Sequence, residues 1–169
     1  SFVHTPGIAL SYYHEELGKE ASRGKYQTGV FSEILVQASA NKLRKYMNKL
    51  NVRGNIVIIP IPSNRRPQLV SQFANRLAKH LQLQYADVLG KRENEPEQKT
   101  ALNSQHQEKN IRDYLFIKDY QNLNNMTIIL VDDFVDSKWT FTVAAELLGT
   151  TYQNVTVIPF AISDTSGSD

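Results

Sequence analysis

Two adjacent carboxylates, Asp132 and Asp133, directly follow a run of five apolar or β-branched residues at 127–131. Ser137 and Thr140 come next, in a short polar stretch before a segment with helical apolar spacing. Carboxylates only accept hydrogen bonds, so they suit the hydroxyl groups of a sugar or a Mg2+ ion. A loop that opens a helix presents backbone N–H groups to an anion such as phosphate. Together these features indicate a site for a phosphorylated sugar.

Three short runs, at residues 55–59, 127–131 and 155–160, are almost continuously apolar and rich in β-branched side chains. Such runs are typical of strands buried on both faces of a parallel sheet. Helical patterns separate them, with Pro67 suited to a first helical turn and Gly149 to a helix end. Strands that alternate with helices predict parallel β-α-β units. We therefore predict an α/β fold, a Rossmann-like parallel sheet with helices on both faces.

The N-terminal part, residues 1–50, has a different pattern, and two helices are predicted in it at residues 8–24 and 31–50. This N-terminal helical segment would pack on the core formed by the main domain at residues 51–169. Residues 90–107 lose the hydrophobic pattern, which predicts a mobile arm, because long loops in compact domains are usually lids or binding loops.

The formal net charge of +2 is too small to indicate nucleic-acid binding by itself. There is no cysteine, which excludes disulfides and thiolate metal sites. No apolar run approaches the roughly 20 residues of a membrane span and no signal-peptide pattern is present, so we expect a cytoplasmic chain that does not contact membranes. The chain starts at Ser1 without a methionine, which fits a trimmed chain or a domain from the C-terminal end of a longer protein.

The segment at residues 128–140 resembles the phosphoribosyl pyrophosphate (PRPP) motif of type I phosphoribosyltransferases. In that motif a hydrophobic strand precedes two acids, two variable residues and a small-residue turn that ends in Thr. The resemblance implies that Asp132 and Asp133 hold the ribose hydroxyls, next to a Mg2+ ion that arrives with PRPP. The expected 5-phosphate ligands are Asp136, Ser137, Lys138, Trp139 and Thr140. In this family the residue at Asp136 can also act as a general base or orienting acid.

A second loop, at residues 60–66, stands where the family has its pyrophosphate loop, after the first parallel strand. It resembles the ComF-like branch, in which a Pro-x-Pro strand end precedes basic residues. Two guanidinium groups in this loop could pair bidentately with phosphate oxygens. The ligand-binding residues implied here are Ser63, Asn64, Arg65 and Arg66.

The arm from Lys91 to Arg112 corresponds to the flexible catalytic loop of the same family. The resemblance implies that Lys91, Arg92 and Lys99 cover the pyrophosphate as catalytic residues. Cleavage at an anomeric carbon develops positive charge on the sugar, so catalysis would consist of leaving-group stabilisation and positioning, without a covalent nucleophile.

A longer resemblance covers most of the chain. Residues 23–26, the loop at 62–67, Gln98-Lys99 and residues 132–140 stand in the order found in the phosphoribosyltransferase-like C-terminal domain of some bacterial RecQ-family ATP-dependent DNA helicases. This implies an accessory domain with DNA as a partner through a parent helicase. The Gly-x-x-x-x-Gly-Lys-[Ser/Thr] loop of a helicase motor does not occur in this sequence.

Lys138 stands where the family usually has glycine, so it either adds charge at the phosphate or blocks the turn. Three functions stay open: a PRPP-binding accessory domain, an active transferase acting on a nitrogenous base, and a non-catalytic module that contacts protein or DNA. Each motif also has a simpler interpretation, since the acid pair could end a strand and cap a helix, and Arg65 and Arg66 could be solvated. Self-association is compatible with all three functions.

Overall fold

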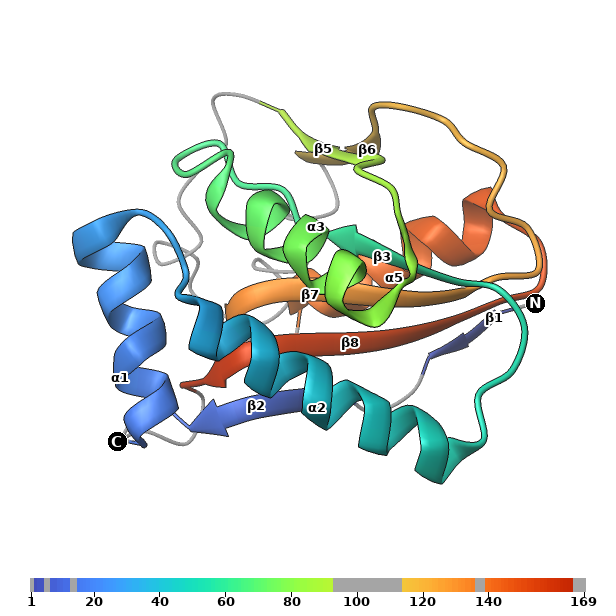
Figure 1. Cartoon of the computed structure of the whole chain (residues 1–169). Coiled ribbons are helices and arrows are strands. Elements are labelled where there is room, and N and C mark those ends of the chain that lie inside the picture. The colour runs from blue at the N-terminus through green and yellow to red at the C-terminus, as the bar shows by residue number, and fades with distance from the viewer. Residues whose placement is uncertain (1, 5–6, 13–14, 93–113, 136–138, 166–169) are drawn as a thin grey trace.

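The computed structural model describes residues 2–4, 7–12, 15–92, 114–135 and 139–165. Within them, a six-stranded sheet has the order β1-β8-β7-β3-β4, and β2 also pairs with β8 (Figure 1). Every strand pair in this sheet is parallel. The strands are β1 (Phe2–His4), β2 (Ile8–Tyr12), β3 (Ile56–Pro60), β4 (Gln84–Tyr85), β7 (Thr127–Val135) and β8 (Val155–Asp164). The helices are α1 (Glu16–Arg23), α2 (Glu33–Leu50), α3 (Leu69–Leu81) and α5 (Trp139–Thr151).

Helices cover both faces of the sheet, which confirms the predicted fold class. Successive side chains of a strand point to opposite faces, so Ile128 packs in the core beneath α5 whereas Ile129 packs in the core beneath α2 and α3. Figure 1 shows α2 and α3 side by side on one face and α5 on the other. Burial on both faces explains why the central strands are continuously apolar rather than alternating.

The predicted helix at residues 8–24 is wrong over its first third. Residues Ile8–Tyr12 form β2, which pairs with the end of β8 from Ile8↔Phe160 to Tyr12↔Asp164. A short apolar run is ambiguous between helix and strand from periodicity alone, and here the unpaired edge of β8 decides the outcome. The first 50 residues thus supply two strands to the sheet as well as helices.

The strand that carries the acid pair is longer than the sequence indicates. Strand β7 continues past Val131 to Val135, because β8 pairs with it as far as Val135↔Asp164. Strand β3 accompanies it only to Pro60↔Val131. The two carboxylates therefore belong to the last part of the strand and not to the loop after it.

The start of the predicted arm is also ordered as a strand. Strand β5 (Leu89–Lys91) pairs antiparallel with β6 (Leu115–Ile117) in a separate small sheet. Gly90 lies so close to β6 that an added Cβ would sit 2.7 Å from the Phe116 ring. The rest of the arm prediction, from residue 93 to 107, lies outside the described residues.

No helix in the described residues is both long enough and apolar enough to cross a membrane.

We expect Gly90→Ala to destabilise the protein by about 1–3 kcal/mol, because the new methyl group overpacks the contact with Phe116. Chemical denaturation monitored by circular dichroism measures this change in the free energy of unfolding. The double variant Gly90→Ala/Phe116→Leu should recover part of the loss, since the shorter side chain makes room. A Gly90→Ala variant as stable as the parent would contradict the close packing of β5 on β6.

Candidate functional site

A cavity of about 300 Å³ opens at the carboxyl ends of β3 and β7. Ligands of open parallel sheets bind at this edge, where loops leave the strands. Its apolar walls come from Ile61, Pro62, Leu69, Val70 and Phe134, and its polar walls come from Lys25, Ser63, Arg65, Arg66, Lys91, Asp132, Asp133 and Thr140. Residues far apart in the sequence therefore converge on one space.

The acid pair lines this cavity. Asp133 is 8% exposed and Asp132 is partly buried. The Asp133 N–H donates to Asp132 Oδ1 at 2.8 Å, and the Phe134 N–H donates to Asp133 Oδ1 at 2.5 Å. These bonds turn both carboxylates toward the backbone of their own strand and fix their orientation.

Burial raises the pKa of the Asp132 carboxyl well above its usual value, and the neighbouring Asp133 charge raises it further. The Lys25 ammonium opposes this rise. Two carboxylates that share a site disfavour each other's ionisation. Lys25 therefore does not fully compensate the charge of the two carboxylates. A ligand could stabilise them further by bringing a cation or by donating hydrogen bonds from its hydroxyl groups.

Lys25 forms an ion pair with this carboxylate pair. Its Nζ lies 3.0 Å from Asp133 Oδ2, and both side chains are mostly buried, at 19% and 11% exposure. The same ammonium lies 4.8 Å from the centroid of the Phe134 ring, a cation–π contact. Lys25 thus reaches from the N-terminal segment into the cavity.

A π-helical turn, η1 (Gly24–Thr28), places Lys25. It continues directly from α1 and ends at Gly29, whose φ of 78° is readily adopted by glycine. Such turns are rare and frequently occur at functional sites. Arg66 holds the turn, because its Nε donates to the Lys25 carbonyl at 3.0 Å and its guanidinium lies 5.2 Å from the Tyr26 ring centroid.

The loop after β3 forms the basic wall of the cavity. It leaves the sheet at Ile61, whose N–H still donates to the Val131 carbonyl at 2.7 Å. The Arg66 N–H then donates to Ser63 Oγ at 3.1 Å, which closes a tight turn. Arg65 and Lys91 add to the basic lining of the cavity.

The sequence model of the phosphoribosyl transferase domain family matches residues 31–162 of this chain. The chain belongs to the phosphoribosyltransferase domain family. The match spans β3, the acid pair and β8, so the cavity described above lies within the matched region.

The fold of this chain is similar to the folds of solved phosphoribosyltransferase structures. The chain is similar to the hypoxanthine phosphoribosyltransferase of Trypanosoma cruzi, with a TM-score of 0.51 and 9% identity over 78% of this chain and 72% of that chain. It is also similar to a hypoxanthine-guanine phosphoribosyltransferase of Bacillus anthracis, with a TM-score of 0.50 and 13% identity over 79% of each chain. The comparison with curated proteins gives no match.

The residues expected to bind the ligand are brought together only in part. Asp132, Asp133, Ser63, Arg65, Arg66, Lys91 and Thr140 line the cavity of this phosphoribosyltransferase domain. Asn64 does not line it; its Nδ2 donates to the carbonyls of Lys91 and Arg92, at 3.1 and 3.0 Å, and so ties the loop to β5.

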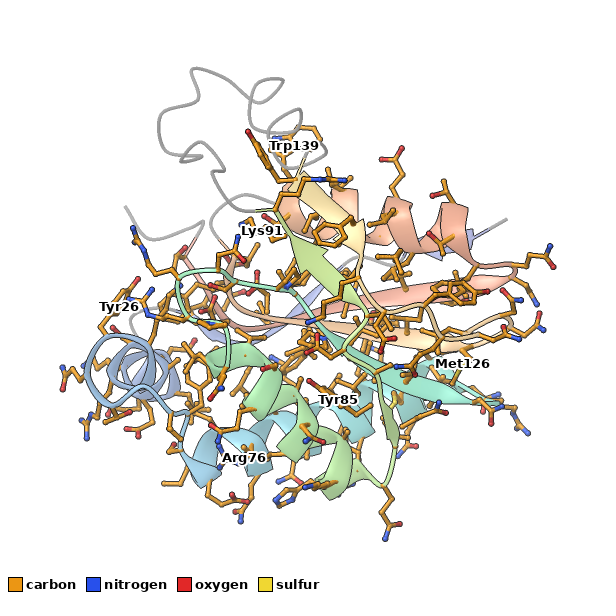
Figure 2. All side chains as sticks on the ribbon, turned by 90° about the horizontal axis from the view of Figure 1, so that it is seen from above. Tyr26, Arg76, Tyr85, Lys91, Met126 and Trp139 are labelled. Carbon is orange, nitrogen blue, oxygen red and sulfur yellow. The ribbon has the colours of Figure 1, made fainter. Side chains whose placement is uncertain are left out.

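Two further expected residues lie beside the cavity rather than in its lining. Trp139 packs against the core under α5, and the Arg92 guanidinium lies 5.0 Å from the Phe116 ring centroid. Figure 2 shows Trp139 and Lys91 on the same side of the molecule, with Arg76 on the other. The expected residues Lys99, Asp136, Ser137 and Lys138 lie outside the described residues.

Lys25 is the site residue that the sequence interpretation missed, although its segment belongs to the longer resemblance. The residue lies more than a hundred positions before Asp133 in the sequence, and it falls between the two helices predicted at residues 8–24 and 31–50. No local spacing connects the two. The only signal was a lysine next to glycine and tyrosine at a predicted helix end.

We expect Asp132→Asn to raise the free energy of unfolding of this phosphoribosyltransferase domain at neutral pH. The folded-state pKa of Asp132 is raised above its unfolded value, so the carboxylate costs stability as pH rises through that range. Asparagine keeps the Oδ1 acceptor but cannot ionise. The gain should shrink as pH falls toward about 4, where the unfolded carboxyl is itself protonated.

Unfolding free energies from denaturant titrations at several pH values test this. The exposed Asp119→Asn serves as control and should change stability by less than about 0.5 kcal/mol at every pH. A destabilised Asp132→Asn, or a gain that does not vary with pH, would contradict the pKa assignment.

Proposed function

We propose that this domain binds PRPP, or a closely related phosphorylated ribose, together with Mg2+ in the cavity at the ends of β3 and β7. One observation carries the proposal: an acid pair and four basic side chains from separate segments converge on the same cavity. Carboxylates accept hydrogen bonds from sugar hydroxyls, and ammonium and guanidinium groups donate to phosphate oxygens. A ligand that carries both hydroxyls and phosphates suits this composition.

The two ends of such a ligand have different places in the cavity. Thr140 lies in the first turn of α5, where the helix dipole favours an anion, so the 5-phosphate belongs at this end. The hydroxyls face Asp132 and Asp133. The second anionic group faces the basic wall made by Arg65, Arg66 and Lys91, with Lys25 between the two sides.

The side chains of the cavity fit Mg2+ only when the ion is bound together with a ligand. Among the described residues there is no group of three or more His, Cys, Asp or Glu side chains that would hold a metal ion. Mg2+ is commonly bound through one or two carboxylates plus substrate phosphates, with water completing the shell. Asp132 and Asp133 would therefore orient the ion indirectly, while it neutralises the phosphate charge.

The same geometry also supports a second candidate, transfer of the phosphoribosyl group. When the bond between the anomeric carbon and the diphosphate breaks, positive charge develops on the sugar and negative charge on the leaving group. The basic wall would stabilise that leaving group, because preorganised charges act strongly in a confined site. The described residues contain no segment that we can assign to base recognition, so the acceptor stays open.

We infer the wider context from the order of the motifs along the chain. The Pro-Ile-Pro strand end followed by Arg65 and Arg66 supports the ComF-like branch. The longer series from Arg23 to Thr140 supports a C-terminal accessory domain of a RecQ-type DNA helicase. Under this proposal PRPP binding would report on nucleotide supply to a DNA-processing enzyme.

We expect Asp132→Asn/Asp133→Asn to weaken PRPP binding by at least about a hundredfold, since each lost charged hydrogen bond is worth roughly 1.5–3 kcal/mol. Isothermal titration calorimetry with and without Mg2+ measures the affinity. The variant Asp87→Asn/Asp119→Asn, which removes the same charge outside the cavity, is the control and should bind as the parent does. Unchanged affinity in the first variant, with its circular dichroism spectrum preserved, would refute the site.

We expect Arg65→Gln to weaken PRPP binding by about tenfold, because it removes one charged contact to the diphosphate. Binding of ribose 5-phosphate should change by less than about twofold, since this ligand has no diphosphate. Arg53→Gln makes the same charge change at the opposite end of β3 and serves as control. Equal losses for both ligands would show that Arg65 does not face the diphosphate.

A further inference from the structure

The small net charge of the chain conceals a strongly polarised distribution. Residues 34–86 contain nine Lys and Arg side chains and no Asp or Glu. The remainder of the chain carries ten basic and seventeen acidic side chains, so the whole reaches only +2. The basic segment comprises most of α2, all of β3 and all of α3, which lie next to one another in the fold.

The cations of this segment divide into two groups. Arg65 and Arg66 line the ligand cavity, and Arg76 pairs with Glu33 at 3.0 Å. Lys42 donates to the carbonyls of Ala9 and Leu10 on β2. The others are exposed and lie on α2, just after it, or in the last turn of α3. We call these five the basic face: Arg44, Lys45, Lys49, Arg53 and Lys79.

The basic face is continuous across the two helices. The Arg44 guanidinium donates to the carbonyl of His80 at 3.0 Å, which places it beside Lys79 at the end of α3. Lys45 and Lys49 are four residues apart on α2 and so occupy one side of the helix. Figure 1 shows α2 and α3 running side by side.

The cations of the basic face are not paired with acidic side chains inside the described structure. Within the part of the chain that the structure describes, Lys45, Lys49, Arg53 and Lys79 form no ion pair with a carboxylate. Cations near helix ends interact favourably with the helix dipole, which accounts for Lys49 and Lys79. It does not account for Lys45 in the middle of α2 or for the absence of any acid over 53 residues.

The composition of the basic face indicates which kind of partner it binds. Protein interfaces are depleted in lysine and centre on apolar or aromatic anchors, whereas this face presents lysine and arginine among neutral polar residues such as Asn41 and Asn48. An anionic membrane is bound by helices that insert a whole apolar face, but most apolar side chains of α2 are buried in the core, and the exposed Ile34 and Leu50 lie at its two ends. A chain of evenly spaced phosphates matches the face best.

We propose that the basic face of α2 and α3 binds the phosphate backbone of duplex DNA without sequence specificity. Single strands are held through aromatic side chains on which bases stack. The basic face itself contains only cations, and the exposed tyrosines at positions 12, 26 and 120 lie on other segments. Contacts of this kind position a protein on the duplex and do not read bases. The face lies at the other end of β3 from the ligand cavity, so both can be occupied together.

Fluorescence anisotropy with a labelled duplex of arbitrary sequence tests the proposal on the intact chain. In Lys45→Gln/Lys49→Gln/Arg53→Gln we expect the slope of log K against log salt concentration to become shallower by about three, because each phosphate contact contributes about 0.9. The charge-reversed set Lys45→Glu/Lys49→Glu/Arg53→Glu should bind at least about tenfold more weakly than the parent at moderate salt. Its PRPP affinity should stay unchanged.

The matched control is Lys19→Glu/Arg23→Glu/Lys118→Glu, which makes the same charge change on exposed side chains elsewhere. This control should retain most of the duplex affinity. Equal weakening in both charge-reversed sets would reduce the effect to net charge and overturn the proposal. Tighter binding of the matching single strand, or equally tight binding of poly-glutamate through the same three residues, would also overturn it.

Discussion

The need to hold two adjacent carboxylates at the end of one strand governs the architecture of the site. Asp132 and Asp133 repel each other, and Asp133 is nearly buried. Such a pair is tolerated only where backbone donors and a counter-charge surround it. Strand β8 holds the backbone of β7 beyond the end of β3. Lys25 supplies the counter-charge. Arg66 holds the π-helical turn that carries Lys25. The acid pair is therefore linked both to the N-terminal segment and to the loop after β3.

The parts of the fold that could be predicted are those with local signals. Continuous β-branched runs marked β3, β7 and β8, because strands buried on both faces need no polar side. The acid pair and Thr140 follow one of these runs at short range, and the structure places all three in the cavity. Topology then brings the loop after β3 to the same edge, since the carboxyl ends of parallel strands coincide.

The parts that could not be predicted depend on contacts between distant segments. Strand β2 exists because β8 offers it an edge some 150 positions later in the chain. The ion pair of Lys25 with Asp133 has the same character. Asn64 shows a different limit, because its residue type fits a ligand as well as it fits the backbone of β5. Even the net charge misleads, since a chain-wide total contains no information about where the charges lie.

Strand β8 has a consequence for the order in which the chain can fold. It pairs with β1 and β2 on one side and with β7 on the other, yet among the described strands it leaves the ribosome last. Strands β1 and β2 must therefore wait until residues 155–164 are synthesised before they find their partner. Such long sequence separations slow folding and leave strand edges exposed in the meantime. A nascent chain that pauses before residue 155 would leave β2 without its partner strand and α1 without the contacts that it makes with β8.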